Sequence, residues 1–264
     1  SKCRPLRAGA AGRAKAQSFY QDNWEPDFTC LHERRIGGDF GLGDGPKWVC
    51  DPHRVAARGS CLVYSIGSHG DFSFEEAIRK HVHEGCEIHT FDPEIQTRRR
   101  NPPEDGRYFI EYAAPGFVTY HRWGLDHVSR PGAEGGHGAL KTLGQTVAEL
   151  GHTGRTIDIF KIDCEGCEWW TFNDWITSGV YVRQILVEVH NKHQPRTDMF
   201  FETMQRSGYV TFHKEPNIGA FGTCVEYALV KLGDSFFEGM EFLHPGDAGV
   251  NQSLANRTPS HTNG

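Results

Sequence analysis

The sequence lacks the features that would assign it at once to several broad classes. No apolar run approaches ~18 residues, so we predict no membrane span. There is no excess of positive charge, because the formal net charge is −6, and this argues against nucleic-acid binding as the main role. The chain begins with serine rather than methionine, so a preceding signal or anchor stays open, as does the compartment, secretory pathway or cytoplasm.

Familiar metal and redox motifs of cysteine and histidine are also missing. Cys164 and Cys167 form a CxxC, but there is no second CxxC to complete a zinc site and no HExxH. We therefore predict a structural role for this pair. Cys61 and Cys86 border predicted core strands, where we expect them to be small buried apolar residues.

What is present predicts one large α/β domain, for which 264 residues provide a full core. The predicted strands are 61–66, 87–91, 108–112, 117–121, 156–162, 182–189, 209–213 and 224–231. The predicted helices are 72–82, 139–150, 168–177 and 197–207. Alternation of strand and helix, followed by two closely spaced strands, predicts a parallel sheet with an antiparallel end hairpin.

Composition divides the chain into four parts. Residues 1–15 are rich in Arg, Ala and Gly, and we predict a disordered tail. Residues 16–58 are predicted to form a small, irregular, glycine-rich N-terminal lobe that packs on the core. Residues 59–244 hold the α/β domain, and the polar residues 245–264 are predicted to be a loose C-terminal tail.

The segment CLVYSIGSHGDFSF, residues 61–74, predicts a buried strand, a tight turn and the start of a helix. Asp92 ends the next strand, 25 residues after Gly67. This arrangement is typical of an adenosine site, because the turn lets the backbone approach the ligand and the acid binds the ribose hydroxyls. An ordinary βα loop is the alternative.

The turn also distinguishes between adenosine-bearing cofactors. It lacks the third glycine of GxGxxG, and Asp71 would repel a pyrophosphate. A carboxylate suits the ammonium group of S-adenosylmethionine (SAM), so we predict SAM rather than NAD. The predicted cofactor contacts are Ser65, Gly67, Ser68, Gly70, Asp71, Phe72, Asp92, Pro93, Trp123, Gly124 and Asp163. The flat ring of Trp123 is expected to stack near the adenine.

Acids and one histidine follow the two central strands. Asp163, Glu165 and Glu168 come within six residues, a costly arrangement unless they are paired or face a cleft. We expect Asp163 to face the sulfonium and Glu165 to orient a substrate or accept a proton; helix capping is the alternative. Glu188 and His190 are two apart and share one side of their strand, so we predict an acid/base pair with His190 as general base.

The same side chains allow a metal reading. Asp163, Glu188 and His190 offer oxygen and nitrogen ligands that suit Mn²⁺ or Fe²⁺ better than Mg²⁺. We keep this as an alternative and expect no metal.

Several of these segments together resemble a known family. IDCEGCEWW resembles the I-D-x-E-G-x-E segment of FkbM-like class I SAM-dependent methyltransferases. With GDGPKWVCDP, YSIGSHGDFSFE, EIHTFDPE and ILVEVH, residues 20–232 are similar to little-characterised methyltransferase-like domain proteins of animals, fungi and algae. The resemblance implies a Rossmann-like sheet of seven strands, mostly parallel with one antiparallel strand. It carries the glycine loop onto 65–71 and places Cys30 and Cys50 in the N-terminal motif, where a disulfide would suit a secretory-pathway protein.

The expected function is methyl transfer from SAM, with O-methylation of a hydroxyl on a small molecule or glycan as the leading hypothesis. A protein Lys or Arg methyltransferase is the alternative, although no NPPY-like segment follows strand 156–162. A non-catalytic SAM-binding scaffold and a NAD-dependent oxidoreductase are two further hypotheses. We expect a small-molecule or glycan acceptor and no nucleic-acid partner, and the sequence does not set the oligomeric state.

Overall fold

The computed structural model describes residues 19–38, 45–93, 97–99, 109–111, 114–132, 138–190, 195–217 and 224–233. Residues 1–231 form one compact unit, and residues 232–264 form a second. The tails predicted at 1–15 and 245–264 lie outside the described residues. In the described part of the chain, no helix has the length and apolar character that a membrane crossing needs.

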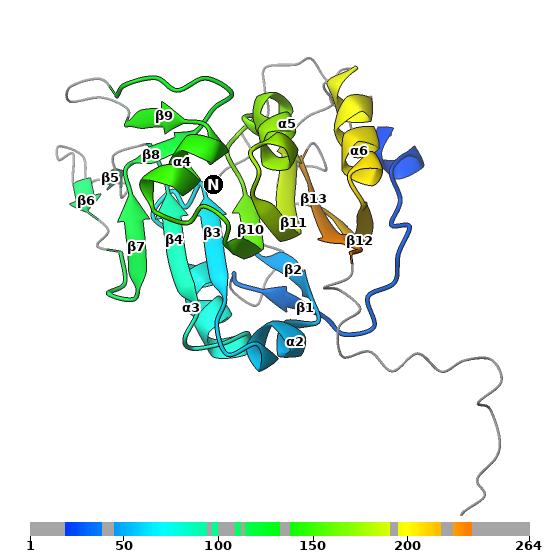
Figure 1. Ribbon diagram of the computed structural model, residues 1–264, viewed down its shortest axis with the longest axis horizontal. Helices are drawn as coiled ribbons and strands as arrows, with labels where there is room; N and C mark the ends of the chain where they lie inside the picture. Colours follow the sequence, from blue (N-terminus) through cyan, green and yellow to red (C-terminus); the bar gives the residue numbers. More distant parts are fainter. Residues whose placement is uncertain are drawn as a thin grey trace, which may run out of the picture. The chain divides into compact units, whose positions relative to one another are not determined.

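The centre of the first unit is a sheet of seven strands in the order β12-β13-β11-β10-β3-β4-β7 (Figure 1). Its strands are β3 Leu62–Ile66, β4 Glu87–Phe91, β7 Val118–His121, β10 Thr156–Ile162, β11 Tyr181–His190, β12 Tyr209–Pro216 and β13 Cys224–Lys231. Strand β13 runs antiparallel to its neighbours β11 and β12, and the other six strands of this sheet all run in one direction. The predicted α/β fold, a mostly parallel Rossmann-like sheet with one antiparallel strand, is confirmed.

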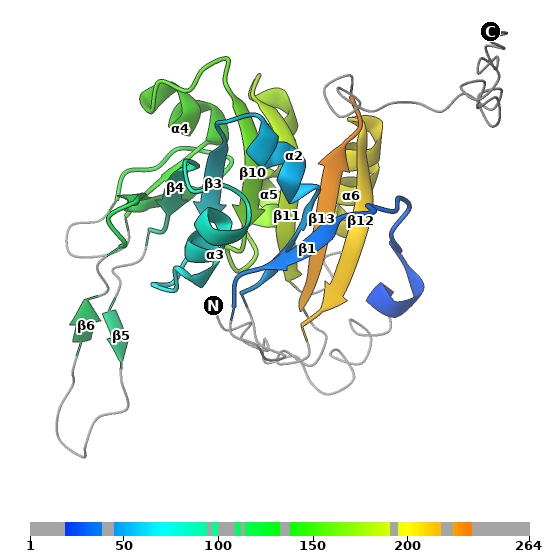
Figure 2. The ribbon, with the colours of Figure 1, turned by 90° about the horizontal axis from the view of Figure 1, so that it is seen from below.

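Both faces of the sheet are covered, which explains why its central strands read as continuous apolar runs. All five residues of β3 are buried, as is the C-terminal half of β11. Helices α4 Leu143–Glu149, α5 Glu168–Thr177 and α6 Arg196–Arg206 lie next to one another on one face. Helix α3 Ser73–His81 and helix α2 Pro52–Ala57 lie on the other (Figure 2). Helix α5 packs Trp169, Phe172 and Trp175 into the core at helical spacing.

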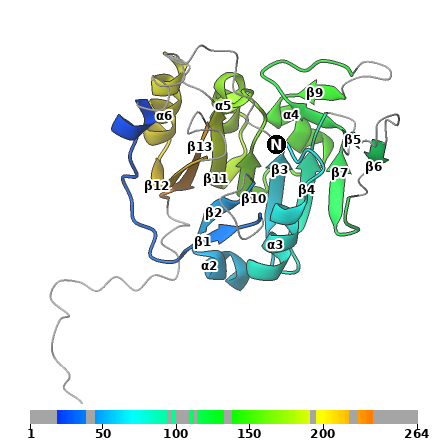
Figure 3. The same cartoon turned by 180° about the vertical axis from the view of Figure 1, so that it is seen from behind.

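The N-terminal segment is more regular than predicted. It forms an antiparallel ribbon of β1 Glu33–Ile36 and β2 Lys47–Cys50, and β2 contacts β11 and β13 (Figure 3). The N–H of Cys50 donates to Oε1 of Gln184, and Nε2 of Gln184 donates back to the Cys50 carbonyl, both at 2.8 Å. A disulfide joins Cys30 to Cys50, the pair for which a disulfide was the hypothesis. The ribbon is therefore attached to the sheet through buried hydrogen bonds between the Gln184 side chain and the backbone of Cys50.

The predicted helix 139–150 is wrong at its start. Residues Ala139–Lys141 are strand β9, which pairs with β8 Trp123–Leu125, and the helix begins after Thr142. The hydroxyl of Thr142 accepts the N–H of Gln145 at 3.1 Å, an N-cap that starts the helix at this point. A further ribbon pairs β5 Thr97–Arg99 with β6 Phe109–Glu111, at the place of the predicted strand 108–112.

The cysteines differ from the prediction in one respect. Cys61 and Cys86 are buried as expected, but a disulfide joins them, so they are not free apolar residues. A third disulfide joins Cys164 to Cys167. The expected structural role of that pair is thus a covalent closure of the turn between β10 and α5, and neither sulfur is a thiolate available to zinc.

Candidate active site

The site lies where the chain changes direction across the sheet. After β3 the chain continues to β4 and β7 on one side, and after β10 it continues to β11 on the other. Ligands bind at such a switch point, beyond the carboxyl ends of the strands. Gly67 follows β3 with a φ of +77°, and a Cβ there would lie 1.7 Å from the carbonyl oxygen of Asp163. This close approach requires glycine at position 67, and it brings the loop after β3 into contact with the end of β10.

The predicted glycine loop and ribose acid lie in contact. His69 adopts a left-handed conformation with φ 46°, and its N–H donates to Oδ2 of Asp92 at 2.7 Å. The Gly70 N–H donates to the hydroxyl of Ser68 at 3.3 Å, which stabilises the turn. Asp92 is buried at the end of β4. The loop therefore orients the carboxylate that we expect to accept the ribose hydroxyls.

The next predicted cofactor residues directly precede helix α3. Oδ1 of Asp71 accepts the N–H of Ser73, the first residue of the helix, at 2.9 Å. Phe72 is the N-cap residue and is buried, with its ring at a centroid distance of 6.4 Å from Tyr120. The bond to Ser73 holds the Asp71 carboxylate beside the loop, and its contact with the SAM ammonium stays a prediction.

The ring of Trp123, on which adenine was expected to stack, already contacts two side chains. The ammonium of Lys141 lies 3.7 Å from the centre of its ring, and His121 lies 4.3 Å from it, centre to centre. A Cβ on Gly124 would lie 3.0 Å from the ring of Pro93, so these two predicted residues are neighbours. Stacking of adenine on Trp123 therefore requires that Lys141 move aside.

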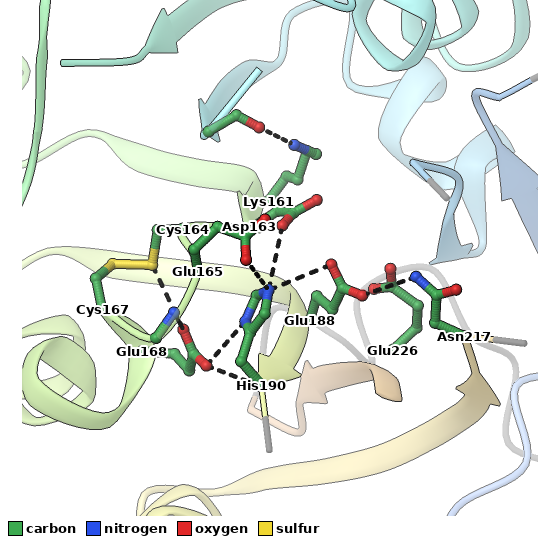
Figure 4. Close-up of polar contacts among 12 residues, drawn as sticks. Lys161, Asp163, Cys164, Glu165, Cys167, Glu168, Glu188, His190, Asn217 and Glu226 are labelled. Carbon is green, nitrogen blue, oxygen red and sulfur yellow. Dashed lines mark hydrogen bonds and ion pairs between the residues drawn. A yellow bond between two sulfur atoms is a disulfide. The ribbon is translucent and has the colours of Figure 1, made fainter. Parts of the chain in front are cut away.

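The predicted catalytic residues converge on one nitrogen (Figure 4). Nε2 of His190 lies 3.8 Å from Oδ1 of Asp163, 3.6 Å from Oε2 of Glu188 and 3.6 Å from Oε2 of Glu165. Asp163, Glu188 and His190 are buried, whereas the Glu165 side chain is 46% exposed. Glu165 therefore lies at the solvent side of the cluster.

Glu168 positions the imidazole. Its Oε1 accepts Nδ1 of His190 at 3.0 Å and also the His190 N–H at 2.9 Å. Its Oε2 accepts the N–H of Gly166 at 3.0 Å, although the capping alternative names Asp163 or Glu165 and not Glu168. The carboxylate is fully buried, so it fixes the ring and does not merely favour the start of α5.

Buried lysines lie behind the acids. Nζ of Lys47 lies 2.6 Å from Oε1 of Glu226 and 3.5 Å from Oδ2 of Asp163. Nζ of Lys161 donates to the carbonyl of Gly67 at 2.8 Å, and this hydrogen bond stabilises the glycine loop. The N-terminal ribbon thus contributes a charged residue to the interior of the site.

These contacts set the charge state of the buried carboxyls. Burial would raise the pKa of Asp163, but Lys47 and Lys161 outweigh it and hold that pKa below its usual range. Burial raises the pKa of Glu188 well above its usual value, and the charges of Asp163 and Glu226 raise it further. Asp163 is therefore the ionised acid, and Glu188 is the one that keeps its proton in the absence of another cation.

The electrostatics of His190 oppose the predicted role of general base. Burial lowers its pKa, but the charge and hydrogen bond of Glu168 outweigh burial and, with Glu188 and Asp163, raise the pKa to about 10. His190 is then an imidazolium at neutral pH, and an imidazolium cannot accept a proton. The prediction considered only Glu188, whereas Glu168 is the largest of the causes that raise the pKa of His190.

Sequence reasoning missed Lys47, Glu226 and the positioning role of Glu168. A signal existed for Glu226, which is a charged residue inside the otherwise apolar strand CVEYALVK. Lys47 lies in the motif GDGPKWVCDP, but nothing in that segment indicates that its side chain is buried against Glu226, 179 residues away.

Comparisons with known proteins gave a family match and a similar solved structure. A family model described as a methyltransferase domain matches residues 4–231. Among solved structures, the chain is similar to a Methanococcus jannaschii fibrillarin pre-rRNA processing protein, with a TM-score of 0.38, 6% identity, and coverage of 66% of this chain and 68% of that one. The curated proteins contain no match.

Proposed function

This chain belongs to the methyltransferase-domain family, and from that premise we propose that it transfers the methyl group of SAM to a hydroxyl on a small molecule or glycan. One observation carries the proposal. The Gly67 loop, oriented on Asp92 by the His69 N–H, lies beside Asp163 at the switch point of the sheet. This is where a nucleoside cofactor binds in a sheet of this topology.

The cofactor would lie across β3, β4 and β10. The backbone at Gly67 allows close approach, and Asp92 accepts the ribose hydroxyls. Asp71 holds the ammonium of the methionine part. Asp163 is a buried carboxylate next to Gly67, where its negative charge favours the sulfonium.

Methyl transfer is an in-line displacement, so positioning supplies much of the rate. The acceptor oxygen forms a bond to the methyl carbon, the carbon–sulfur bond breaks, and its electron pair stays on sulfur to give S-adenosylhomocysteine. The hydroxyl proton needs an acceptor other than His190. We assign this role to Glu165, whose exposed carboxylate lies 3.6 Å from Nε2 of His190.

A cationic acceptor, such as a Lys or Arg side chain of a protein, is the second candidate. The observation that favours it is the excess of carboxylates over ammonium groups in the cluster, which would attract a positive acceptor. A non-catalytic SAM-binding scaffold is the third.

Calorimetric titration with SAM, S-adenosylhomocysteine and NAD tests the cofactor. We expect both sulfur ligands to bind and NAD to be inert. Asp92→Ala removes a charged hydrogen-bond acceptor for the ribose, a loss of about 1.5–3 kcal/mol, so binding of SAM should weaken roughly 10- to 100-fold. Asp22→Ala, at an exposed aspartate, is the matched control and should bind SAM as the unaltered protein does.

Radiolabelled SAM then separates the acceptors. Label in a pool of alcohols and glycans supports the proposal, and label only in a peptide pool supports the protein alternative. SAM binding without any transfer leaves the scaffold. Equal SAM affinity in Asp92→Ala and the unaltered protein would show that the adenosine site has been misplaced.

A further inference from the structure

The buried imidazole of His190 has one nitrogen without a hydrogen-bond partner among the residues that the structure describes. That atom is Nε2, and the side chain is only 5% exposed. Three carboxylate oxygens surround it at 3.6–3.8 Å, from Asp163, Glu165 and Glu188. These separations are too long for hydrogen bonds. They are separations expected between two atoms that bind the same ion.

A metal ion could bind these atoms together. Two atoms that each lie about 2.1 Å from an ion, and 3.6–3.8 Å from each other, subtend roughly 120–130° at that ion. Figure 4 shows that Asp163 and Glu188, at the ends of β10 and β11, turn their carboxylates toward Nε2 of His190, and that Glu165 approaches from the turn after β10. The distances from Nε2 to Asp163 and to Glu188 are therefore those of atoms that could bind one ion.

The other nitrogen of the ring supports the same reading. Nδ1 of His190 lies 3.0 Å from Oε1 of Glu168, a carboxylate that is itself buried and held by two backbone N–H groups. A carboxylate that binds one ring nitrogen directs the lone pair of the other toward a metal, and this arrangement accompanies most metal-binding histidines. Glu168 thus prepares Nε2 as a ligand.

Binding of a metal ion would require that Glu188 and His190 lose the protons that they carry without it, because the groups that bind a metal are deprotonated. Each lost proton is one positive charge, so a divalent cation that replaces two protons leaves the charge of the buried cluster unchanged.

A second cluster of possible ligands, Glu87, His89 and His152, differs in its contacts. Oε1 of Glu87 already lies at hydrogen-bond distance from both rings, 2.9 Å from His89 and 3.0 Å from His152. Arg155 supplies a positive charge at 2.6 Å from Oε2 of Glu87. In that cluster Nε2 of both histidines has a carboxylate oxygen at hydrogen-bond distance, whereas Nε2 of His190 has none among the described residues.

We propose that Asp163, Glu188 and His190 bind one divalent cation of the Mn²⁺ type, in a mixed oxygen and nitrogen coordination shell. This revises the expectation that no metal is present. Glu165 lies at the exposed side, so the remaining positions are open to water or to an acceptor hydroxyl. The catalytic role of the ion rests on the proposed function. A coordinated hydroxyl loses its proton to Glu165 more easily, and the resulting alkoxide attacks the methyl carbon of SAM.

The test uses the whole protein, freed of metal with EDTA and desalted. MnCl₂ is added while the electron paramagnetic resonance signal of free aqueous Mn²⁺ is followed, with MgCl₂ and CaCl₂ as competitors. We expect about one Mn²⁺ per chain. Glu188→Gln keeps the shape of the side chain but loses a ligand, and it should weaken Mn²⁺ binding at least about 10-fold.

Glu226→Gln is the matched control. Glu226 lies directly opposite Glu188 in the β11–β13 register and is also buried, but its Oε1 is bound to Lys47. We expect Mn²⁺ affinity to change less than about 3-fold. Thermal melting of the metal-free variants establishes that each is folded. Asp163→Asn, a second ligand variant, replaces Glu188→Gln if the latter does not fold.

The outcomes separate this inference from the proposed function. Absence of stoichiometric Mn²⁺ binding would overturn the metal site even if SAM binds. Equal weakening by Glu188→Gln and Glu226→Gln would also overturn it, because it would indicate general attraction to negative charge. Mn²⁺ binding by a protein that does not bind SAM would support the site and refute the methyltransferase role.

Discussion

Lys47→Met is expected to be among the most destabilising single changes in this protein. The Lys47 side chain is 1% exposed, and its ammonium lies 2.6 Å from Oε1 of Glu226 and 3.5 Å from Oδ2 of Asp163. Methionine has a similar length and fills the same space, so packing is largely kept. What is lost is the cation that compensates two buried carboxylates.

The magnitude follows from the cost of an uncompensated buried charge. Removal of one member of a buried ion pair costs about 3–5 kcal/mol, and Lys47 is shared between two acids, so we expect the upper half of that range at neutral pH. With a urea m-value of roughly 3 kcal/mol/M for a domain of this size, the midpoint should fall by about 1.3–1.7 M.

The pH dependence gives a second, independent check. Lys47 is one of the charges that hold the pKa of Asp163 below its usual range, so the variant binds protons more readily in its folded state. A folded state that binds more protons loses stability as the pH rises. The difference between Lys47→Met and the unaltered protein should therefore be smaller at pH 5 than at pH 8.

The assay is urea unfolding followed by tryptophan fluorescence under non-reducing conditions, for Lys47→Met, Glu226→Gln and the double variant. Glu226→Gln removes one of the two orphaned charges, so the double variant should recover about 1–3 kcal/mol. A loss below about 1 kcal/mol at pH 8, or strict additivity in the double variant, would refute the argument that Lys47 compensates the buried charges of Glu226 and Asp163.

Two further predictions concern the glycine loop and a buried histidine. Gly67→Ala should abolish measurable SAM binding in calorimetry, because its Cβ would meet the Asp163 carbonyl; Gly154→Ala, with a similar φ of +80° and nothing within 4 Å, should cost only about 1–2 kcal/mol of backbone strain and leave SAM binding intact. Burial, with a smaller effect of His89, lowers the pKa of His121 to about 4, so the unfolded state binds more protons between pH 6.5 and 4. Stability to urea should fall over that window by up to roughly 3 kcal/mol, and His121→Phe should flatten the decline; an unchanged slope would contradict the assignment.

Much of the fold was predictable from apolar runs. The bounds predicted for strands 87–91, 156–162 and 224–231 and for helix 168–177 agree with the structure, because each is a buried run with its own period. The short ribbons β1–β2 and β8–β9 were missed. Their residues become strands only because a partner lies beside them, and such pairing has no local period.

The candidate site was predictable only in its general position. Gly67, Asp92, Asp163 and Glu188 each follow or end a strand, and the carboxyl ends of parallel strands meet at one edge, so the sequence placed them together. It did not place Lys47, because the antiparallel ribbon that carries it joins the sheet through tertiary contacts alone.

By itself, the sequence determined the parallel sheet, the position of the glycine loop and the acids at its edge, since these follow from periodicity and from strand order. The tertiary structure decided the charges that those acids and His190 carry. A pKa depends on burial and on every charged group within a few ångströms, and around His190 these groups come from the ends of β10 and β11 and from the start of α5. Their distances exist only once the chain has folded.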